Sequence, residues 1–252
     1  MKKILLLALC AAIIAIFLSG CVSVNFGYPI GFGGSGPGVA GRGASESYTF
    51  NTGSITEIRM SMYCDVELYT TPSDTVTLEV QPNLLEYIVV EESGGILTVR
   101  STGNIVWSSG NAPILTVGTA SLSSVNFAGA GSLTAHDTIT GDSFSLDFSG
   151  AGVVTAELDV EHLSVGVSGA GDIRLSGTAD TADFSLAGAG RVEALSLQTR
   201  ESDVKLAGAA TLKVACSERL KVNAGGVGTV EYRGSPSVDI TRGGMVSIRQ
   251  VS

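Results

Sequence analysis

The 252-residue chain is long enough for one large domain, and its 44% of hydrophobic residues excludes an intrinsically disordered protein. Glycine is over-represented, at 33 residues, whereas charged residues make up only 15%. The formal net charge of −9 argues against nucleic acid as a partner and against electrostatic docking to anionic lipid.

Residues 1–20 have the layout of a secretory signal peptide. Lys2 and Lys3 give a basic start, residues 4–17 form an apolar stretch, and a small-residue pair precedes Cys21. The ending resembles the lipobox of bacterial lipoproteins, which predicts that Cys21 becomes the acylated first residue of the mature chain. The alternative is an ordinary signal peptide or anchor with an incidental cysteine, although the apolar stretch is short for a membrane-spanning helix.

The predicted location is the bacterial cell envelope, with the lipid as the link to the membrane. Val22 follows the cysteine, and by resemblance to Gram-negative lipoproteins this permits sorting to the outer membrane. Without Lys2 and Lys3 the chain keeps 13 basic and 24 acidic residues, a net charge of −11. Residues 21–45 are predicted to be the lipidated cysteine and a glycine-rich tether, which as a flexible coil would span about 27 Å.

Residues 46–122 are predicted to form strands of irregular spacing. Residues 87–90 and 96–99 are expected to pair as a hairpin around Ser93-Gly94-Gly95. This region is expected to share the core and to cap one end of the fold, because an uncapped end would expose strand edges and apolar surface.

Residues 123–252 repeat one phrase, Gly-Ala-Gly followed by a short apolar alternation. Anchor glycines of the series are Gly129, Gly150, Gly169, Gly188, Gly208 and Gly226, spaced by 21, 19, 19, 20 and 18 residues. The second glycines of the clearest copies are Gly131, Gly152, Gly171 and Gly190. A fixed period near 20 indicates a solenoid.

Apolar residues recur two and four positions before each anchor, and four and six positions after it. This period of two is the signal of β-strands. A final copy is expected around Arg242-Gly243-Gly244, with Val238, Ile240, Val246 and Ile248 at the same offsets and the glycines displaced by one position.

The predicted fold is all-β: a right-handed parallel β-helix, or β-solenoid, with about 18–21 residues per coil and a less regular N-terminal β cap. The glycines are expected at sharp corners that need unusual backbone angles and room for the next coil, and alanine would stack there without crowding. Stacked α-helical hairpins are the disfavoured alternative, because glycine and β-branched residues both oppose helix.

The chain resembles the family described as "putative auto-transporter adhesin, head GIN domain". The resemblance covers residues 47–250 and rests on Cys64 to Leu68, Val76 to Leu84 with Glu86 to Val90, Gly94 to Val99 and, above all, the phrase repeated at 127–131, 148–152 and 167–171. It implies a right-handed β-helix, a proposed role in adhesion and no established catalytic residues. Ala210 and Arg242 depart from the glycine pattern in the last copies.

No metal site, cofactor or catalytic residue is predicted. The positions three after each anchor hold only one acid, Asp172, so a calcium ladder is not expected. Two histidines, His136 and His162, occupy unrelated repeat positions and are expected at the surface. The exported cysteines Cys64 and Cys216 could pair as a disulfide or remain buried thiols.

The predicted function is a non-catalytic, lipid-anchored adhesion or interaction module whose ligand is a glycan or a protein. One alternative is a polysaccharide lyase or hydrolase, which would need converging acids and a positive group such as Arg174 or Arg191. Another is a self-assembling structural protein of the envelope. Trp107 could stack on a sugar or cover the cap, and the cap is favoured.

Overall fold

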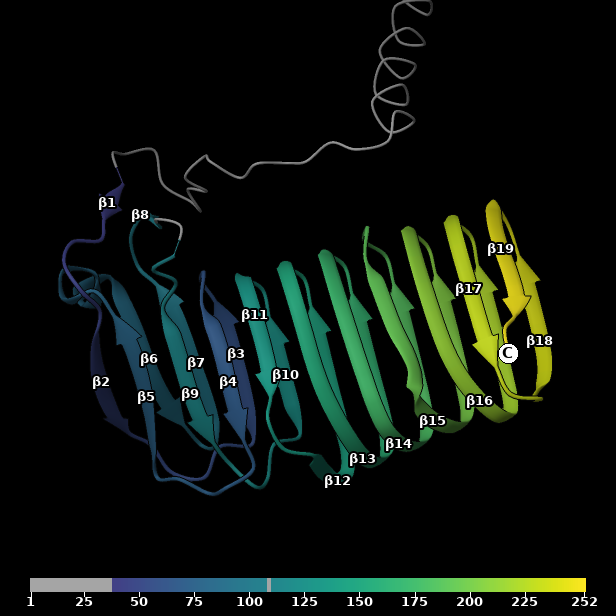
Figure 1. Cartoon of the computed structure of the whole chain (residues 1–252), viewed down its shortest axis with the longest axis horizontal. Helices are drawn as coiled ribbons and strands as arrows, with labels where there is room; N and C mark the ends of the chain where they lie inside the picture. Colours follow the sequence, from purple (N-terminus) through teal and green to yellow (C-terminus); the bar gives the residue numbers. More distant parts are fainter. Residues whose placement is uncertain (1–37, 108–109) are drawn as a thin grey trace, which may run out of the picture.

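The computed structural model describes residues 38–107 and 110–252. The predicted signal peptide, Cys21 and most of the predicted tether lie outside the described residues. The chain is 70% strand and 3% helix, and its parallel strands stack as a β-solenoid of about seven turns (Figure 1). The predicted all-β solenoid is therefore confirmed. No helix among the described residues is long and apolar enough to span a membrane.

The regular half begins at β10 (Ser124–Phe127) and β11 (Ala130–Ala135). It continues through β12 (Ile139–Phe148), β13 (Ala151–Val167), β14 (Ala170–Leu186), β15 (Arg191–Leu206), β16 (Ala209–Ala224), β17 (Val227–Arg233), β18 (Ser237–Arg242) and β19 (Met245–Gln250). Each strand that ends before a Gly-Ala-Gly corner stacks on its counterpart, which builds one face of the solenoid. Strands that begin after the corner build the second face, and the long strands bend around an opposite corner from the second face of one coil to the first face of the next.

The N-terminal half contains β1 (Val39–Ala40), β2 (Glu46–Asn51), β3 (Glu57–Ser61), β4 (Asp65–Tyr69), β5 (Thr75–Val80), the 3-10 helix η1 (Pro82–Tyr87), β6 (Ile88–Ser93), β7 (Ile96–Ser101), β8 (Ile105–Val106) and β9 (Ile114–Gly118). The expected hairpin is present as β6 and β7, which pair antiparallel around Gly94 and Gly95.

This half does more than cap the solenoid. Strands β3 and β4 form a coil that lies between β7 and β9 on one side and β10 and β11 on the other. Antiparallel strands then close the end: β6 lies outside β7, and β5 and β2 lie outside β9. The spatial order of the coils therefore differs from their order in the sequence, and the predicted cap consists of β2, β5, β6 and η1.

The predicted boundary of the tether at residue 45 is wrong, because residues 38–45 already belong to the folded part. Strand β1 pairs with β8. The side chain of Asn83 accepts a hydrogen bond from the Arg42 amide at 2.8 Å and donates one to the Ala40 carbonyl at 2.9 Å. Gln81 donates to the carbonyl of Gly43 at 3.0 Å. Backbone groups of this polar, glycine-rich segment thus find their partners on η1 and β8.

Core side chains stack in columns at the predicted offsets from the anchors. Two positions before the anchors, the column runs through Met60, Phe127, Phe148, Val167, Leu186, Leu206 and Ala224, all at most 2% exposed. The rings of Phe127 and Phe148 stack with centroids 5.4 Å apart. Because the inward columns are mainly apolar, each coil buries its inner face against its neighbours, and the buried polar pair Thr199 and Ser202 hydrogen-bond to each other at 2.8 Å.

Anchor glycines form a ladder of close backbone contacts. A Cβ atom on Gly150 would lie 1.8 Å from the carbonyl oxygen of Gly129, and one on Gly169 would lie 2.0 Å from that of Gly150. Neither glycine has a positive φ. The expectation of unusual backbone angles is therefore wrong at these anchors, and the close approach of the next coil is what requires glycine.

The last copy keeps the anchor that the sequence interpretation displaced. Gly244 stacks on Gly226, since its Cβ would lie 2.4 Å from that carbonyl oxygen. Arg242 consequently stacks on Ala224, and Val246 stacks on Gly228 rather than on Val230. The predicted positions of the apolar residues relative to the anchor were therefore wrong by two residues. The last corner lacks the alanine that marks the position after the anchor in the corners from Gly129 to Gly208.

Candidate functional site

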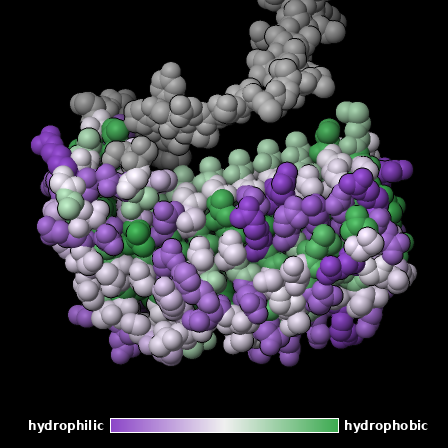
Figure 2. Space-filling view, viewed as in Figure 1, coloured by the Kyte–Doolittle hydropathy of each residue, from purple (hydrophilic) through white to green (hydrophobic). Residues whose placement is uncertain are grey.

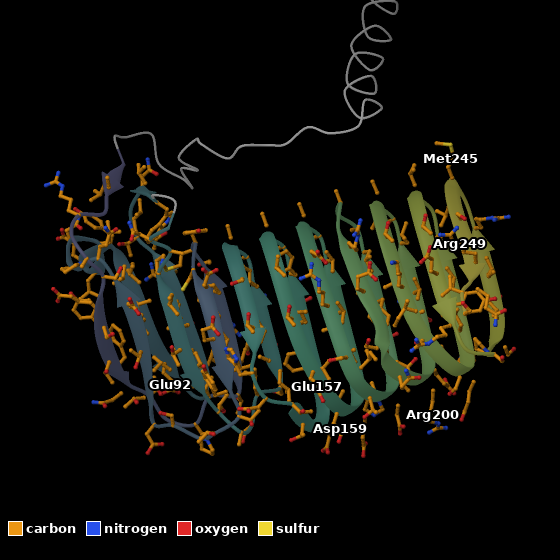
Figure 3. All side chains as sticks on the ribbon, in the orientation of Figure 1. Glu92, Glu157, Asp159, Arg200, Met245 and Arg249 are labelled. Atoms are coloured by element: carbon orange, nitrogen blue, oxygen red, sulfur yellow. The ribbon has the colours of Figure 1, made fainter. Side chains whose placement is uncertain are left out.

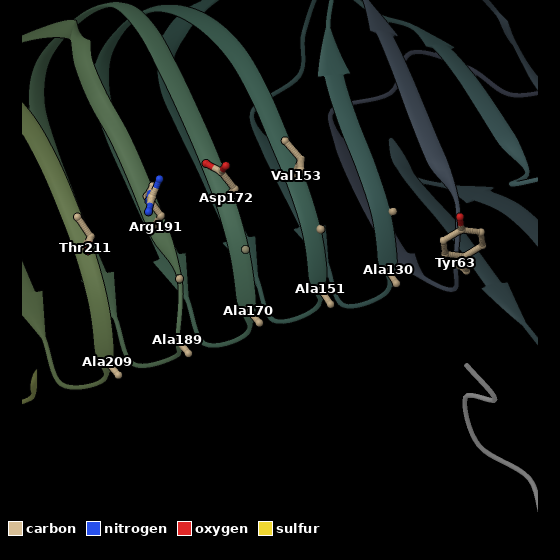
Figure 4. Close-up of a pocket in the computed structure, with 14 residues that line it drawn as sticks. Tyr63, Ala130, Ala151, Val153, Ala170, Asp172, Ala189, Arg191, Ala209 and Thr211 are labelled. Carbon is tan, nitrogen blue, oxygen red and sulfur yellow. The ribbon is translucent and has the colours of Figure 1, made fainter. Parts of the chain in front are cut away.

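The Gly-Ala-Gly corners present an exposed apolar row along one side of the solenoid, which we call the apolar rim. In order along the axis it consists of Tyr63, Ala130, Ala151, Ala170, Ala189, Ala209, Val227 and Met245. Ala130 is buried and Tyr63 half-buried, whereas the other six are exposed. Figure 2 shows it as pale green residues along the upper edge of the molecule. The close-up in Figure 4 shows five of its alanines in register, with Tyr63 at one end.

The rim follows from the repeat itself. Four of the five alanines lie between two glycines, and Ala209 lies between Gly208 and Ala210. The corner backbone is in contact with the next coil, so the methyl groups point away from the core. Coils stack about 4.8 Å apart, which sets the spacing of the methyl groups. Larger side chains occupy both ends of the row: Tyr63 lies at one end, and Val227, 51% exposed, and Met245, 75% exposed, lie at the other.

Tyr63 occupies the alanine position of the β3–β4 coil, where Met62-Tyr63-Cys64 replaces Gly-Ala-Gly. A side chain fits at position 62, where the later coils have glycine. The neighbouring layer is formed by β7 and β9, and these strands are joined through β8 rather than by a tight corner. The ring of Tyr63 lies 5.8 Å from that of Trp107, centroid to centroid. Burial, and secondarily the charge of Asp65, raises the pKa of Tyr63.

Trp107 packs against the core beside Tyr63. It therefore lies on the corner of the β3–β4 coil, whereas the cap consists of β2, β5, β6 and η1.

A second row runs beside the rim and contains Val153, Asp172, Arg191 and Thr211 (Figure 4). Together the two rows line an open groove of about 860 Å³ whose lining is mostly apolar. Asp172 is ion-paired with Arg174 at 2.6 Å, so the one acid at this repeat position already has a cationic partner. Arg191 lines the same groove with its side chain 62% exposed, and its Nε lies 4.0 Å from the carboxylate of Glu193.

The opposite corner gathers acids that the sequence analysis did not connect. Asp142, Glu161 and Asp180 follow one another on successive coils, and Arg200 and Glu218 continue the row. The signal was present in the sequence, since all five lie eight positions before an anchor. Figure 3 shows Asp159 and Arg200 on this lower edge, away from Met245 on the rim.

This acidic row does not have the geometry of a glycosidase site. Its carboxylates stand side by side along one corner, whereas glycosidases use two acids that face each other across a bound sugar. Arg200 forms ion pairs with Asp180 at 3.6 Å and Glu218 at 3.1 Å, and the bonded guanidinium lowers the pKa of Glu218. Among residues 38–107 and 110–252, no group of three histidine, cysteine or acidic side chains could hold a metal ion.

Ion pairs of alternating sign cross the second face near its C-terminal end. Lys213 lies 3.0 Å from Glu193 and 3.8 Å from Glu231, and Arg249 donates to Glu231 at 3.0 Å. The hydrogen bond from Arg249 lowers the pKa of Glu231. This ladder ties the last strand, β19, to the coils beneath it.

The remaining candidate residues have structural surroundings. His162 is exposed and bonded to Thr181 at 2.8 Å, and exposed His136 stacks on Tyr69 with ring centroids 4.6 Å apart. Cys64 and Cys216 are both free and buried, so they do not form a disulfide. Burial raises the pKa of Cys64.

A family model described as "putative auto-transporter adhesin, head GIN domain" matches residues 54–236. The chain is similar to a solved structure of a putative adhesin from Bacteroides fragilis, with a TM-score of 0.76 and 20% sequence identity over 85% of this chain and 100% of that one. A putative lipid binding protein from Parabacteroides distasonis gives a TM-score of 0.68 at 20% identity, over 86% of this chain and 100% of that one. A putative adhesin from Parabacteroides merdae gives 0.65 at 20% identity, over 85% and 99%. These likenesses show a shared fold. No curated protein matches the chain.

Proposed function

This chain belongs to the family described as "putative auto-transporter adhesin, head GIN domain", and on that premise we propose that it is a non-catalytic adhesion module of the bacterial cell envelope. Membership of an adhesin family implies a cell-surface or envelope location. The finer assignment is that acylated Cys21 anchors the chain to a membrane, the outer membrane in a Gram-negative cell, and that the residues after it hold the solenoid away from the lipid.

The observation that carries the proposal is the apolar rim with its groove. Contiguous exposed apolar surface on a soluble fold marks an interaction site. Here the surface is straight and rigid, because each alanine is fixed at a corner packed against the next coil. Such a row fits an extended ligand, a glycan chain or a protein segment, better than a compact small molecule.

Polar groups at the rim would supply specificity. Tyr63 offers an aromatic face and a hydroxyl group, and Arg191 offers an exposed guanidinium part-way along the groove, with Glu193 4.0 Å from its Nε. Aromatic rings that stack on sugars and guanidinium groups that donate to hydroxyls or carboxylates are ordinary means of recognising carbohydrate. The acidic row on the opposite corner motivates the rival function, a carbohydrate-active enzyme.

The proposal is tested with the chain from residue 22 onward on an array of bacterial and host glycans. We expect binding by the wild type, at least tenfold weaker binding by Tyr63→Ala and Arg191→Ala, and unchanged binding by the control Lys205→Ala, which lies on the first face away from the groove. Equal effects of all three substitutions would reject the rim as the binding surface. Absence of binding to every glycan would reject a carbohydrate ligand.

A further inference from the structure

The apolar rim is a straight row that extends along the solenoid from Tyr63 to Met245. Its residues stack from coil to coil at about 4.8 Å, so the row is about 34 Å long. Charged side chains that line the groove, Asp172 and Arg191, lie in the second row rather than in the rim itself. An occupant of the rim therefore needs a long apolar face and little charge.

Residues 22–32, which lie outside the described residues, carry such a face in their sequence. Apolar and aromatic residues alternate strictly with small or polar ones, and residues 22–37 contain no charged side chain. In an extended chain this period of two places all the large side chains on one face. The residues of that face are Val22, Val24, Phe26, Tyr28, Ile30 and Phe32.

The same stretch does not have the sequence of another strand of the sheet. Pro29 lacks the amide hydrogen that a strand ladder uses, and Gly27 and Gly31 weaken strand pairing. The alternation therefore suits an extended segment that packs one face on an apolar surface without joining a sheet.

The described chain begins beside one end of the rim. Strand β1 pairs with β8, and Gly38 packs against Val106 of that strand. Trp107 follows directly, and its ring lies 5.8 Å from that of Tyr63, the first residue of the rim. Figure 1 shows β1 and β8 above the same upper edge that carries the rim, at the end far from β19. A segment that precedes Gly38 therefore starts next to the groove.

We propose that residues 22–32 occupy the groove of their own chain, with the apolar face on the rim, Phe32 near Tyr63 and Val22 near Met245. The lengths agree, because residues 22–32 span about 33 Å when extended, at roughly 3.3 Å per residue. Residues 33–37 remain as the connection to Gly38. Since groove and segment belong to one chain, the contact benefits from an effective concentration on the order of millimolar.

This contact would regulate the rim, a step that rests on the proposed function and on anchoring at Cys21. A ligand of the rim must displace the segment, so its apparent affinity is reduced by the fraction of chains in which the groove is free. The bound segment keeps Cys21 near the Met245 end of the rim. Its release lets the same residues act as a spacer between the lipid and the solenoid.

Disulfide trapping in the chain from residue 22 onward, without glycan, tests the contact. Phe26→Cys is combined with Ala189→Cys on the rim or, as a matched control, with Ser185→Cys on the first face of the same coil, where both positions are exposed. The pair with Ala189→Cys should form its disulfide at least about tenfold faster. Native Cys64 and Cys216 are buried, which keeps them out of the reaction.

Charge on the apolar face should remove this preference. Tyr28→Asp with Phe32→Asp should make the two rates equal, whereas Ser23→Asp with Asn25→Asp adds the same charge to the other face and should leave their ratio unchanged. Equal rates before these changes, an unaltered ratio after the first pair, or disulfide-linked dimers in place of monomers would overturn the proposal.

The regulatory step is measured separately on the glycan array. The variant with Tyr28→Asp and Phe32→Asp should bind at least several-fold more tightly than the wild type, since its groove is free. Because trapping is measured without glycan, a rim that binds no carbohydrate would reject the proposed ligand and leave the trapping result as it stands.

Discussion

At the scale of single residues, close backbone contact rather than backbone conformation explains the anchor glycines. We expect Gly169→Val to lower the free energy of unfolding by on the order of 3 kcal/mol or more, because its side chain would overlap the carbonyl of Gly150. Gly141→Ala is the matched control, since nothing lies within 4 Å of its Cβ position. Chemical denaturation measures both, and near-equal stability of the two variants would contradict the stacked-corner account.

The buried thiol of Cys64 predicts a dependence of stability on alkaline pH. Because its pKa is raised in the folded state, the thiol stays neutral at a pH where the unfolded chain ionises, above about 8.5. Stability is therefore complete below that value and falls by up to about 1.4 kcal/mol per pH unit above it. Urea titrations between roughly pH 8 and 10 should show this slope in the wild type, and Cys64→Ala should lack it.

At the scale of strands, the last coil depends on charges that alternate across the second face. Glu231→Gln should lower the melting temperature at pH 7, because Arg249 loses its acidic partner and Lys213 loses one of its two. The pKa of Glu231 is depressed, so its contribution is present above the unfolded value near 4.3 and is lost as pH falls through the folded value. The difference between variant and wild type should therefore vanish in acid.

Glu157→Gln provides the comparison for this effect, since Glu157 is exposed and has no ion pair among the described residues. Equal melting temperatures for Glu231→Gln and Glu157→Gln at pH 7 would show that the ladder contributes nothing to holding β19.

Much of the strand architecture was predictable because one short phrase repeats at nearly constant spacing. The period of two around each glycine fixed which residues face the core, and those columns are buried as expected. The insertion of β3 and β4 between β7 and β10 was not predictable, since Met62-Tyr63-Cys64 carries no glycine although it fills the same corner. The residue types of this segment do not indicate that it is equivalent to a Gly-Ala-Gly corner. The pairing of Tyr63 with Ala130 in the structure shows that it is.

Parts of the candidate site were also hidden for physical reasons. The alanines of the rim read as small spacers in the sequence, and their exposure as one surface depends on all corners being aligned in space. Tyr63 and Met245 join that surface from coils that break the repeat. The acidic row at the opposite corner could have been found by aligning the positions eight before each anchor.

At the scale of the whole molecule, charge is distributed unevenly along the axis. Residues 38–122 carry three basic and nine acidic side chains, whereas residues 199–252 carry eight basic and five acidic ones. Residues 123–198 carry two basic and ten acidic side chains, so the acidic part extends from the end at which the described chain begins through the middle of the solenoid. An anionic membrane would repel it, which agrees with an anchor that acts through lipid rather than through charge.

Anchoring through lipid predicts a clear effect of one substitution. Cells expressing the full chain with an alkyne-bearing palmitate should label the wild type and leave Cys21→Ala unlabelled, and the variant should leave the membrane fraction. Labelling that persists in Cys21→Ala would contradict acylation at this residue, and membrane retention without label would indicate another anchor.

Binding without turnover is the central claim, and it is tested most directly by measuring both in the same wells. The chain from residue 22 onward is held on immobilised glycans while bound protein and released products are quantified over time. The account predicts retained protein with no new reducing ends or unsaturated sugars. Product that accumulates with the wild type and disappears with Glu161→Gln would show instead that the acidic row is catalytic, and would make this solenoid an enzyme.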